Sequence, residues 1–359
     1  MKGFNWEVGS TWYADDFCPA EDYTLRLKFI ADSSNVTLLS TCRSAIKLIL
    51  DKIGGQHHRA LVPSFTCHSV IDPFLTAGYD VKGYSLNENL QIDIDVFSSL
   101  VNDFRPDIIL VHGYFGFNTV GSASNILESC KARGIIVIED KTQTMFSDFK
   151  AIAADYTIGS IRKWLPIPDG AFIKGMHISE LTQDSALADA KIKAMRAKNR
   201  YFATGDGNKC EFMRFFADAE NLLDSRTLPH SISSYSLSAL TALNLKEFAN
   251  RRRNNYNLLA RRLSRHSEVQ LIFKEALTDD VPFLLPVYID DKRAEFQRYM
   301  ASHNVYPTII WKCPDALENI IDKDSRRIYD RILCFHVDQR YEAADMNKVA
   351  DIVDSYFSN

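Results

Sequence analysis

Short apolar runs alternate with amphipathic stretches over residues 36–160 of this sequence. The apolar runs are rich in Ile, Val and Leu and predict strands at 59–65, 80–86, 106–114, 135–140 and 155–160. The stretches around them repeat apolar residues at helical spacing and predict helices at 44–53, 68–78, 95–104 and 122–134. Such alternation is typical of βαβ units. We therefore expect an α/β fold with a mainly parallel sheet flanked by helices.

The pattern changes near residue 233. One long helix, or two in sequence, is predicted over 233–266, and apolar runs then alternate with helices up to a terminal helix at 343–357. This second alternation suits a smaller α/β domain. We therefore expect a large domain over 1–240 and a small C-terminal domain over 241–359.

The composition argues against several classes of function. A net charge of −4 gives no overall attraction for nucleic acid or for an anionic membrane. No apolar run approaches the roughly 20 residues needed to cross a bilayer, and the opening residues lack the apolar core of a secretory signal. The 7 cysteines form no CxxC pair and the 9 histidines no HExxH motif. We therefore expect free thiols, no metal site and a cytoplasmic location.

Three features of the first domain carry candidate chemistry. Asp140 ends a buried strand, a small-residue turn at 40–43 enters a helix, and Lys163 follows the next strand in a stretch where two prolines exclude a regular element. Pyridoxal phosphate (PLP) requires all three. A lysine amine forms its Schiff base, a carboxylate keeps its ring nitrogen protonated, and a helix N-terminus binds its phosphate. PLP is therefore the expected cofactor.

Each of these features also has an ordinary explanation. A carboxylate at a strand end is more often a solvated loop residue, a lysine at a bend more often lies on the surface, and a Ser-Thr-Cys turn is usually a helix cap. Their order in one chain, with a single short strand between Asp140 and Lys163, favours the combined interpretation.

The sequence resembles the PLP-dependent sugar aminotransferases of the DegT/StrS group over nearly its whole length. The resemblance implies PLP fold type I, the fold of aspartate aminotransferase. It is carried by these segments: EVGSTW at 7–12, STCRSAIKLIL at 40–50, LVPSFTCHSVIDPFLTAGYDV at 61–81, IIVIEDKTQTMF at 135–146, GSIRKWLPIPDGAF at 159–172, RRRNNYNLLARRL at 251–263 and ILCFHVDQRYEAADM at 332–346.

The resemblance implies a role for each matching residue. Lys163 would carry the Schiff base and transfer the proton, Asp140 would pair with the pyridine nitrogen, and Gln143 would touch the ring face or its 3-hydroxyl. Ser160 would bind the phosphate. The turn that would bind it too consists of Thr41, Cys42 and Arg43.

Two segments depart from the family pattern. The aromatic residue that usually stacks on the cofactor is replaced by Cys67, with His68 beside it as a possible stacker. The segment expected to reach a neighbouring subunit, SSYSLSAL at 233–240, lacks the usual Asn and Arg. No partner-chain residue is therefore assigned, although the resemblance implies a homodimer.

The implied activity is transfer of an amino group to the keto group of a nucleotide-linked sugar, with glutamate as the donor. Two alternatives stay open: a PLP-dependent sugar dehydratase or lyase, and a PLP-fold protein that binds a ligand without turnover. A nucleic-acid regulator is disfavoured because the arginines at 251–265 are expected to form a solvated helix face. His112 is expected to be a hydrogen-bonded core histidine. Trp311 is expected either in the core or covering the active site.

Overall fold

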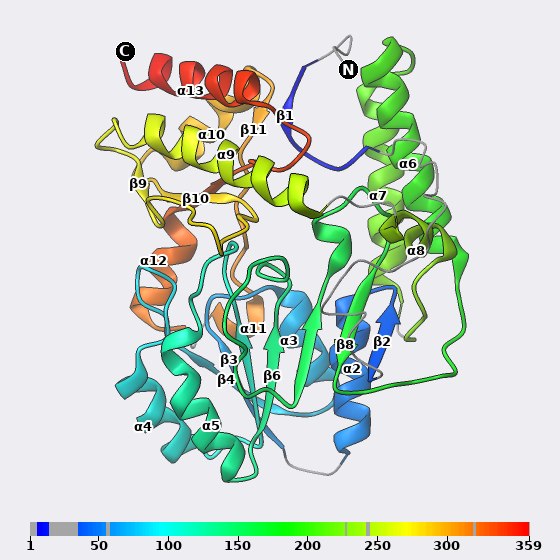
Figure 1. The fold of residues 1–359 in the computed structure, drawn as a ribbon, viewed down its shortest axis with the longest axis vertical. Helices are drawn as coiled ribbons and strands as arrows, with labels where there is room; N and C mark the ends of the chain where they lie inside the picture. Colours follow the sequence, from blue (N-terminus) through cyan, green and yellow to red (C-terminus); the bar gives the residue numbers. More distant parts are fainter. Residues whose placement is uncertain are drawn as a thin grey trace. The chain divides into compact units, whose positions relative to one another are not determined.

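The computed structural model describes residues 6–13, 35–54, 58–226, 228–241, 245–318 and 321–358. These residues, drawn as a ribbon in Figure 1, divide into two units, each built from two separate stretches of chain. Unit 1 comprises residues 1–48 and 158–245, and unit 2 comprises residues 49–157 and 246–359. The division into consecutive domains at 240/241 stays a prediction.

The main sheet has seven strands in the order β2-β8-β7-β6-β5-β3-β4. β3 pairs in parallel with β4 and β5, and β5 pairs in parallel with β6, whereas β2 and β8 are antiparallel. The strands are β2 (Val36–Leu39), β3 (Arg59–Pro63), β4 (Asp80–Tyr84), β5 (Ile108–His112), β6 (Ile136–Asp140), β7 (Tyr156–Gly159) and β8 (Ala171–Lys174). The predicted α/β fold with a mainly parallel sheet is therefore confirmed.

Local sequence explains both the burial of the central strand β5 and the ends of the helix α4. β5 is buried at every position, as its unbroken apolar run predicts. The Asp93 carboxylate accepts from the Val96 amide to begin α4, which ends at Arg105 in the left-handed region. The helices are α2 (Cys42–Ile53), α3 (His68–Thr76), α4 (Ile94–Phe104) and α5 (Ser124–Ala132), and α5 follows the 3-10 turn η1 (Gly121–Ala123).

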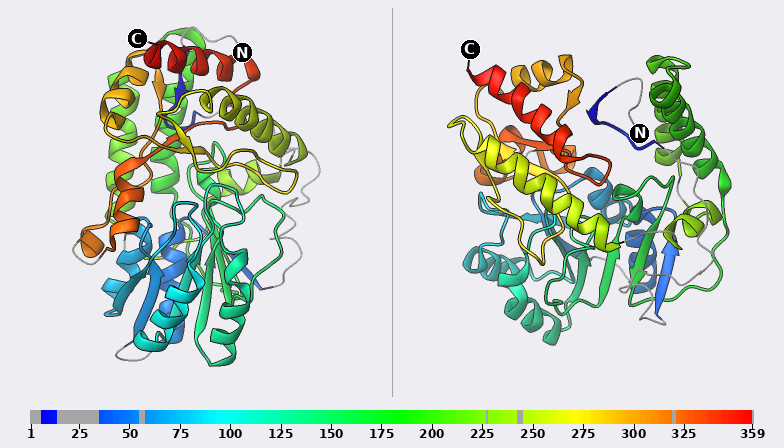
Figure 2. Two further views of the ribbon diagram at one scale, coloured as in Figure 1. Left: turned by 90° about the vertical axis from the view of Figure 1, so that its left-hand side faces the viewer. Right: turned by 45° about the horizontal axis from the view of Figure 1, so that its top comes forward.

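The C-terminal part of unit 2 contains an antiparallel sheet in the order β12-β10-β9. Two helices of this part, α9 and α13, lie side by side, and Arg262 of α9 pairs there with Asp354 of α13 (Figure 2). The elements are α9 (Leu245–Leu263), β9 (Gln270–Leu271), β10 (Leu285–Tyr288), α10 (Arg293–Ser302), β11 (Val305–Tyr306), α11 (Asp315–Glu318), α12 (Lys323–Arg331), β12 (Ile332–Phe335) and α13 (Ala343–Phe357).

Unit 1 contains a pair of packed helices that the sequence patterns do not single out. They are α6 (Ser185–Thr204) and α7 (Lys209–Asp224), and their buried seam includes Met195, Phe212 and Phe216 (Figure 2). The Asp184 side chain caps α6 and the Asn208 side chain caps α7. The remaining elements of unit 1 are β1 (Val8–Gly9), the 3-10 turn η2 (Ile161–Lys163) and α8 (Ser234–Thr241).

A buried cluster of charges corrects one expectation about the arginine-rich helix α9. Arg252 is only 1% exposed, so this arginine does not belong to a solvated face. Its guanidinium donates to the carbonyls of Pro282 and Phe283, and burial lowers its pKa to about 9. The buried carboxylate of Asp338 lies near Arg252. It accepts two hydrogen bonds from Arg340, from Nε at 2.8 Å and from Nη2 at 2.9 Å. Burial alone would raise the pKa of Asp338, but the arginines outweigh it and hold that pKa well below its usual value.

We expect Asp338→Asn to lower the free energy of unfolding by about 3–5 kcal/mol, because the arginine charges then stay buried without their counter-ion. The wild-type stabilisation is present above a pH of about 4, where an unfolded aspartate is ionised, and is lost as the pH falls through the lower folded pKa. Urea denaturation at several pH values measures both effects. The matched control is Asp351→Asn, which removes an exposed partner of Arg262 and should cost less than about 1 kcal/mol. Equal costs for the two variants would contradict this account.

Within the described residues, no helix is both long enough and apolar enough to cross a membrane.

Candidate functional site

Asp140, the last residue of β6, is a buried carboxylate with a defined set of partners. Its Oδ1 accepts from the Thr142 amide at 2.8 Å, and its Oδ2 lies 3.2 Å from Nδ1 of His112, the last residue of the neighbouring strand β5. Burial alone would raise the pKa of Asp140, but His112 and the Thr142 hydrogen bonds outweigh burial and lower the pKa. The carboxylate is therefore ionised at neutral pH although it is withdrawn from water.

His112 differs from the hydrogen-bonded core histidine that the sequence suggests. Its ring is buried, and its Nδ1 makes a 3.2 Å ion-pair contact with Asp140 that lacks hydrogen-bond alignment. Nε2 has no hydrogen-bond partner among the residues that the structure describes. A buried, unpartnered ring nitrogen is uncommon in folded proteins. The pair of His112 and Asp140 therefore places one ionised oxygen and one unused ring nitrogen at the carboxyl ends of adjacent parallel strands, where such sheets bind ligands.

Gln143 lies in the turn after β6 and is buried. Its Oε1 accepts from the amide of Phe115 at 2.8 Å, so the side chain holds the loop that follows β5. In that loop Phe115 has a φ of 55° and Gly116 a φ of 95°, and a bulky residue rarely adopts a positive φ. Gln143 therefore stabilises a strained backbone next to His112.

The loop after β5 is also fixed from the C-terminal stretch of unit 2. Ser147 donates its hydroxyl to the carbonyl of Gly116 and accepts from the amide of Val281, while Phe283 donates its amide to the carbonyl of Phe115. A Cβ at Gly116 would lie 2.1 Å from the Val281 carbonyl oxygen, so only glycine fits there.

We expect Gly116→Ala to destabilise the protein by about 2 kcal/mol more than Gly134→Ala. Both glycines have a positive φ, but a Cβ at Gly134 meets no heavy atom within 4 Å. The control therefore reports the backbone cost alone, which is about 1–2 kcal/mol. Thermal or urea denaturation of the two variants gives the difference. Equal destabilisation would show that the loop can move away from Val281 without cost.

The candidate stacking residues lie at the start of α3. Cys67 is the residue before the helix, and its sulfur accepts from the Ser69 hydroxyl at 3.2 Å. His68 is the first helical residue, and its side chain is 67% exposed and lies 3.0 Å from the Asp72 carboxylate. The His68 ring is therefore exposed and paired within its own helix, which does not favour a position at the strand ends where Asp140 lies.

Tyr329 of α12 is a site neighbour that no sequence pattern indicates. Its hydroxyl accepts from the Thr66 amide at 2.8 Å and lies within hydrogen-bonding distance of the Ser64 and Thr66 carbonyls. The tyrosine therefore fixes the backbone between β3 and Cys67. No local motif could have found it, because the contact joins segments more than two hundred residues apart in sequence.

Lys163 ends the 3-10 turn η2 in unit 1, and its side chain is half-buried. The Lys163 amide donates to the carbonyl of Ser160 at 3.4 Å, which closes the turn. Its amine makes no hydrogen bond or ion pair within the described part of the chain. Ser160 is buried at the entrance of the turn. The lysine is thus held at its backbone while its amine stays available.

The predicted phosphate turn of unit 1 begins α2. The Thr41 hydroxyl accepts from the amide of Ser44 at 3.2 Å, which makes Thr41 a helix cap. Cys42 is the first residue of the helix and is partly exposed. Arg43 extends to Asp224 at the end of α7, at 3.2 Å. The turn thus offers a helix N-terminus, whereas the Arg43 guanidinium already has a carboxylate partner.

The 233–240 segment, which lacks the expected Asn and Arg, is held by Asp169, a buried carboxylate of unit 1. Asp169 accepts from the amide and hydroxyl of Ser233, at 2.9 and 2.6 Å, and from the hydroxyl of Ser236 at 2.5 Å. These serines therefore order the beginning of α8. The sequence signal that could have found the contact is the pair of serines three residues apart that enters a helix.

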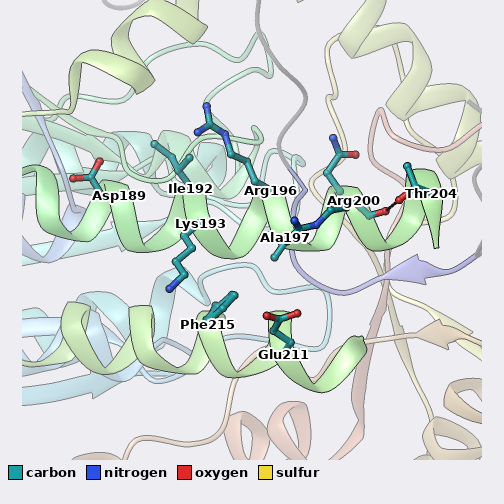
Figure 3. A pocket seen from close by; sticks show the side chains of 10 residues that line it. Asp189, Ile192, Lys193, Arg196, Ala197, Arg200, Thr204, Glu211 and Phe215 are labelled. Carbon is teal, nitrogen blue, oxygen red and sulfur yellow. Dashed lines mark hydrogen bonds between the residues drawn. The ribbon is translucent and has the colours of Figure 1, made fainter. Parts of the chain in front are cut away.

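A surface groove of about 1040 Å³ follows α6 where it lies beside α7 (Figure 3). Long side chains of both charge signs line it, including Lys193, whose amine lies 4.2 Å from the centre of the Phe215 ring. None of the sequence-predicted site residues contributes to this groove. In the ranges that the structure describes, no group of three or more His, Cys, Asp or Glu side chains could hold a metal ion.

No protein-family model and no curated protein matches this sequence. Several solved structures are similar to it over most of both chains. The aminotransferase TlmJ from Streptoalloteichus hindustanus is 16% identical, with 95% of this chain and 92% of that chain covered and a TM-score of 0.66. DesV from S. venezuelae, solved in complex with a ketimine intermediate, is 14% identical, with 94% and 88% covered and a TM-score of 0.68. The sugar aminotransferase CalS13 from Micromonospora echinospora is 14% identical, with 94% and 98% covered and a TM-score of 0.62.

The chain has the fold of these aminotransferases. At this level of identity the likeness concerns the fold, and the chemistry has to be argued from the side chains of this chain. In the aminotransferase fold observed here, Asp140 ends a central strand of the main sheet and Lys163 follows β7.

Proposed function

We propose that the protein is a PLP-dependent aminotransferase that moves an amino group, with glutamate as donor, to the keto group of a nucleotide-linked sugar. The observation that carries this proposal is the buried carboxylate of Asp140, held by His112 and the Thr142 amide at a strand end of the aminotransferase fold. Among proteins of similar fold, Spr1654 from Streptococcus pneumoniae is solved in PLP and PMP forms, and DesI in the presence of its TDP-sugar product. These relatives support the choice of cofactor and substrate class.

The residues present fit PLP. A carboxylate that is buried yet ionised is what holds a proton on a pyridine nitrogen, because burial strengthens the attraction between the two charges. When bound, PLP serves as an electron sink for the substrate carbon that loses its proton. Asp140 binds the ring nitrogen in this proposal, and His112 keeps Asp140 ionised and correctly oriented.

Lys163 has the two properties that its proposed role requires. Its amine is available, and its backbone is fixed in a short 3-10 turn. We assign to it the covalent attachment of the cofactor and the transfer of a proton from the substrate carbon. The N-terminus of α2, with Thr41 and Cys42, and Ser160 are proposed to hold the phosphate, because the amides and the dipole at a helix start favour an anion. Arg43 can join them only if it leaves Asp224.

An absorption experiment with a single amino donor tests the proposal. The purified protein is loaded with PLP and mixed with glutamate in the absence of any keto acceptor. A transaminase converts the cofactor to the pyridoxamine form and releases a stoichiometric amount of 2-oxoglutarate, as ping-pong chemistry requires. A lyase or dehydratase would bind PLP without releasing 2-oxoglutarate. A protein that stays colourless after PLP is added would contradict the proposal.

We also propose that the enzyme works as a homodimer in the cytoplasm. The dimer follows the family resemblance, and the location follows the 7 scattered cysteines of the sequence, whose odd number suits free thiols in a reducing compartment. Light scattering on the purified protein tests the dimer, and a monomer at micromolar concentration would contradict it.

A further inference from the structure

Four rings come together at the carboxyl ends of β3 and β5 in unit 2. His112 lies edge-on to Tyr114 with 4.7 Å between ring centres, and Phe65 lies 5.6 Å from Tyr114. The fourth ring is Trp311, 5.7 Å from His112 and 5.4 Å from Phe65. Trp311 therefore touches the histidine that contacts Asp140, and it also touches the loop that leads to Cys67.

The four rings differ in what they can offer a ligand. Phe65 is completely buried, and Tyr114 is 1% exposed and donates its hydroxyl to the Phe65 carbonyl at 2.5 Å. His112 is buried as well. Trp311 alone among these four is half-buried and keeps exposed aromatic surface. Of the four rings, only the indole is exposed enough for a ligand beside the Asp140–His112 pair to contact it.

The segment that leads to Trp311 is tied to the C-terminal sheet of unit 2. Thr308 and Cys334 exchange two backbone hydrogen bonds, at 2.8 and 2.9 Å, which tie the segment before Trp311 to β12. The apolar run at 306–311 is therefore not a regular strand beyond Tyr306, and its irregular course brings the indole to the strand ends of the main sheet. An aromatic side chain on such a segment costs little conformational entropy when it binds a ligand.

We propose that Trp311 supplies the aromatic surface on which the cofactor ring bound at Asp140 packs. The inference rests on the proposed function. The thiol of Cys67 has no π-face, and the His68 ring is exposed and paired with Asp72, so neither residue offers this surface. An indole beside the Asp140–His112 pair does, because a protonated pyridine ring is electron-poor and an indole is electron-rich.

The affinity for pyridoxamine phosphate tests this role, because that form binds without a covalent bond to Lys163. Its Kd is measured by equilibrium dialysis for the wild type, Trp311→Ala and Trp311→Phe. We expect Trp311→Ala to raise the Kd about tenfold or more, as loss of a stacking partner does elsewhere, and Trp311→Phe to stay within about threefold of wild type. The control is Tyr356→Ala, which removes a half-buried aromatic ring of α13 that contacts neither His112 nor Phe65.

The outcomes separate the inference from the proposed function. If the wild type binds pyridoxamine phosphate and Trp311→Ala binds it equally well, the role of Trp311 is refuted and the aminotransferase proposal stands. A wild type that binds neither PLP nor pyridoxamine phosphate overturns both. Circular dichroism verifies folding. If Trp311→Ala does not fold, Trp311→Leu replaces it, since leucine keeps apolar bulk without a π-face, and the same increase in Kd is expected.

Discussion

Replacing Lys163 with alanine should lower turnover about 10³-fold or more and remove the visible absorption band of lysine-bound PLP. The amine both attaches the cofactor and moves the proton in the proposed reaction, and general acid–base catalysis alone contributes about 10²–10⁴-fold. The structure leaves that amine without a partner in the described residues, so its loss breaks no interaction that holds the fold together. Initial-rate measurements with glutamate and absorption spectra of the PLP-loaded variant provide the test.

The matched control for this substitution is Lys174→Ala. Lys174 is an exposed residue on β8 of the same unit, so its loss should change neither the rate nor the spectrum. The proposed role of Lys163 would be refuted if Lys163→Ala kept the wild-type rate and absorption band.

Replacing Asp140 with asparagine should lower turnover about 10²–10³-fold, which is the usual cost of removing one preorganised charge from an active site. Asparagine has the same size and can still accept from the Thr142 amide, so the turn after β6 should survive. It cannot hold a proton on a pyridine nitrogen. Because His112 and Thr142 lower the pKa of Asp140, the wild type should also show no loss of activity from protonation of this residue between about pH 5 and pH 8.

The control for the second substitution is Asp148→Asn, which changes an exposed carboxylate in the same turn region of unit 2. It should leave the rate within about twofold of wild type, as surface substitutions usually do. An Asp140→Asn variant with the wild-type rate would mean that the ring nitrogen binds elsewhere or needs no counter-charge.

The central strands of the main sheet could be predicted because they are largely buried on both faces, whereas the edge strand β4 exposes Asp80 and Lys82. β5 appears in the sequence as an unbroken apolar run up to His112, and β6 as an apolar run that ends at Glu139 and Asp140. The helices between strands keep a clear helical period. The sequence pattern does not predict the helix pair α6–α7, because buried Lys191 and Lys198 interrupt the apolar face of α6. Lys198 is tolerated there since its amine pairs with Glu7 and donates to the Thr11 carbonyl.

The candidate site could be predicted only where local sequence carries the signal. Asp140 at a strand end and Thr41 at a helix start are local features, and the structure places both as their sequence context predicts. The partners of Asp140 were not predictable in the same way. His112 reaches it from another strand, and Trp311 reaches His112 from a segment that pairs with β12. Contacts of this kind depend on how distant segments pack together, and the hydrophobic periodicity of one sequence does not reveal that packing.

Borohydride reduction followed by peptide mapping is the most direct test of the central claim. The protein is incubated with PLP, reduced, digested and analysed by mass spectrometry for the modified residue. We predict a single phosphopyridoxyl group on the amine of Lys163, with much weaker labelling of the Asp140→Asn variant at limiting PLP. Labelling of another lysine, or labelling spread over several exposed lysines as in an unfolded chain, would contradict the claim that Lys163 is the cofactor-binding residue.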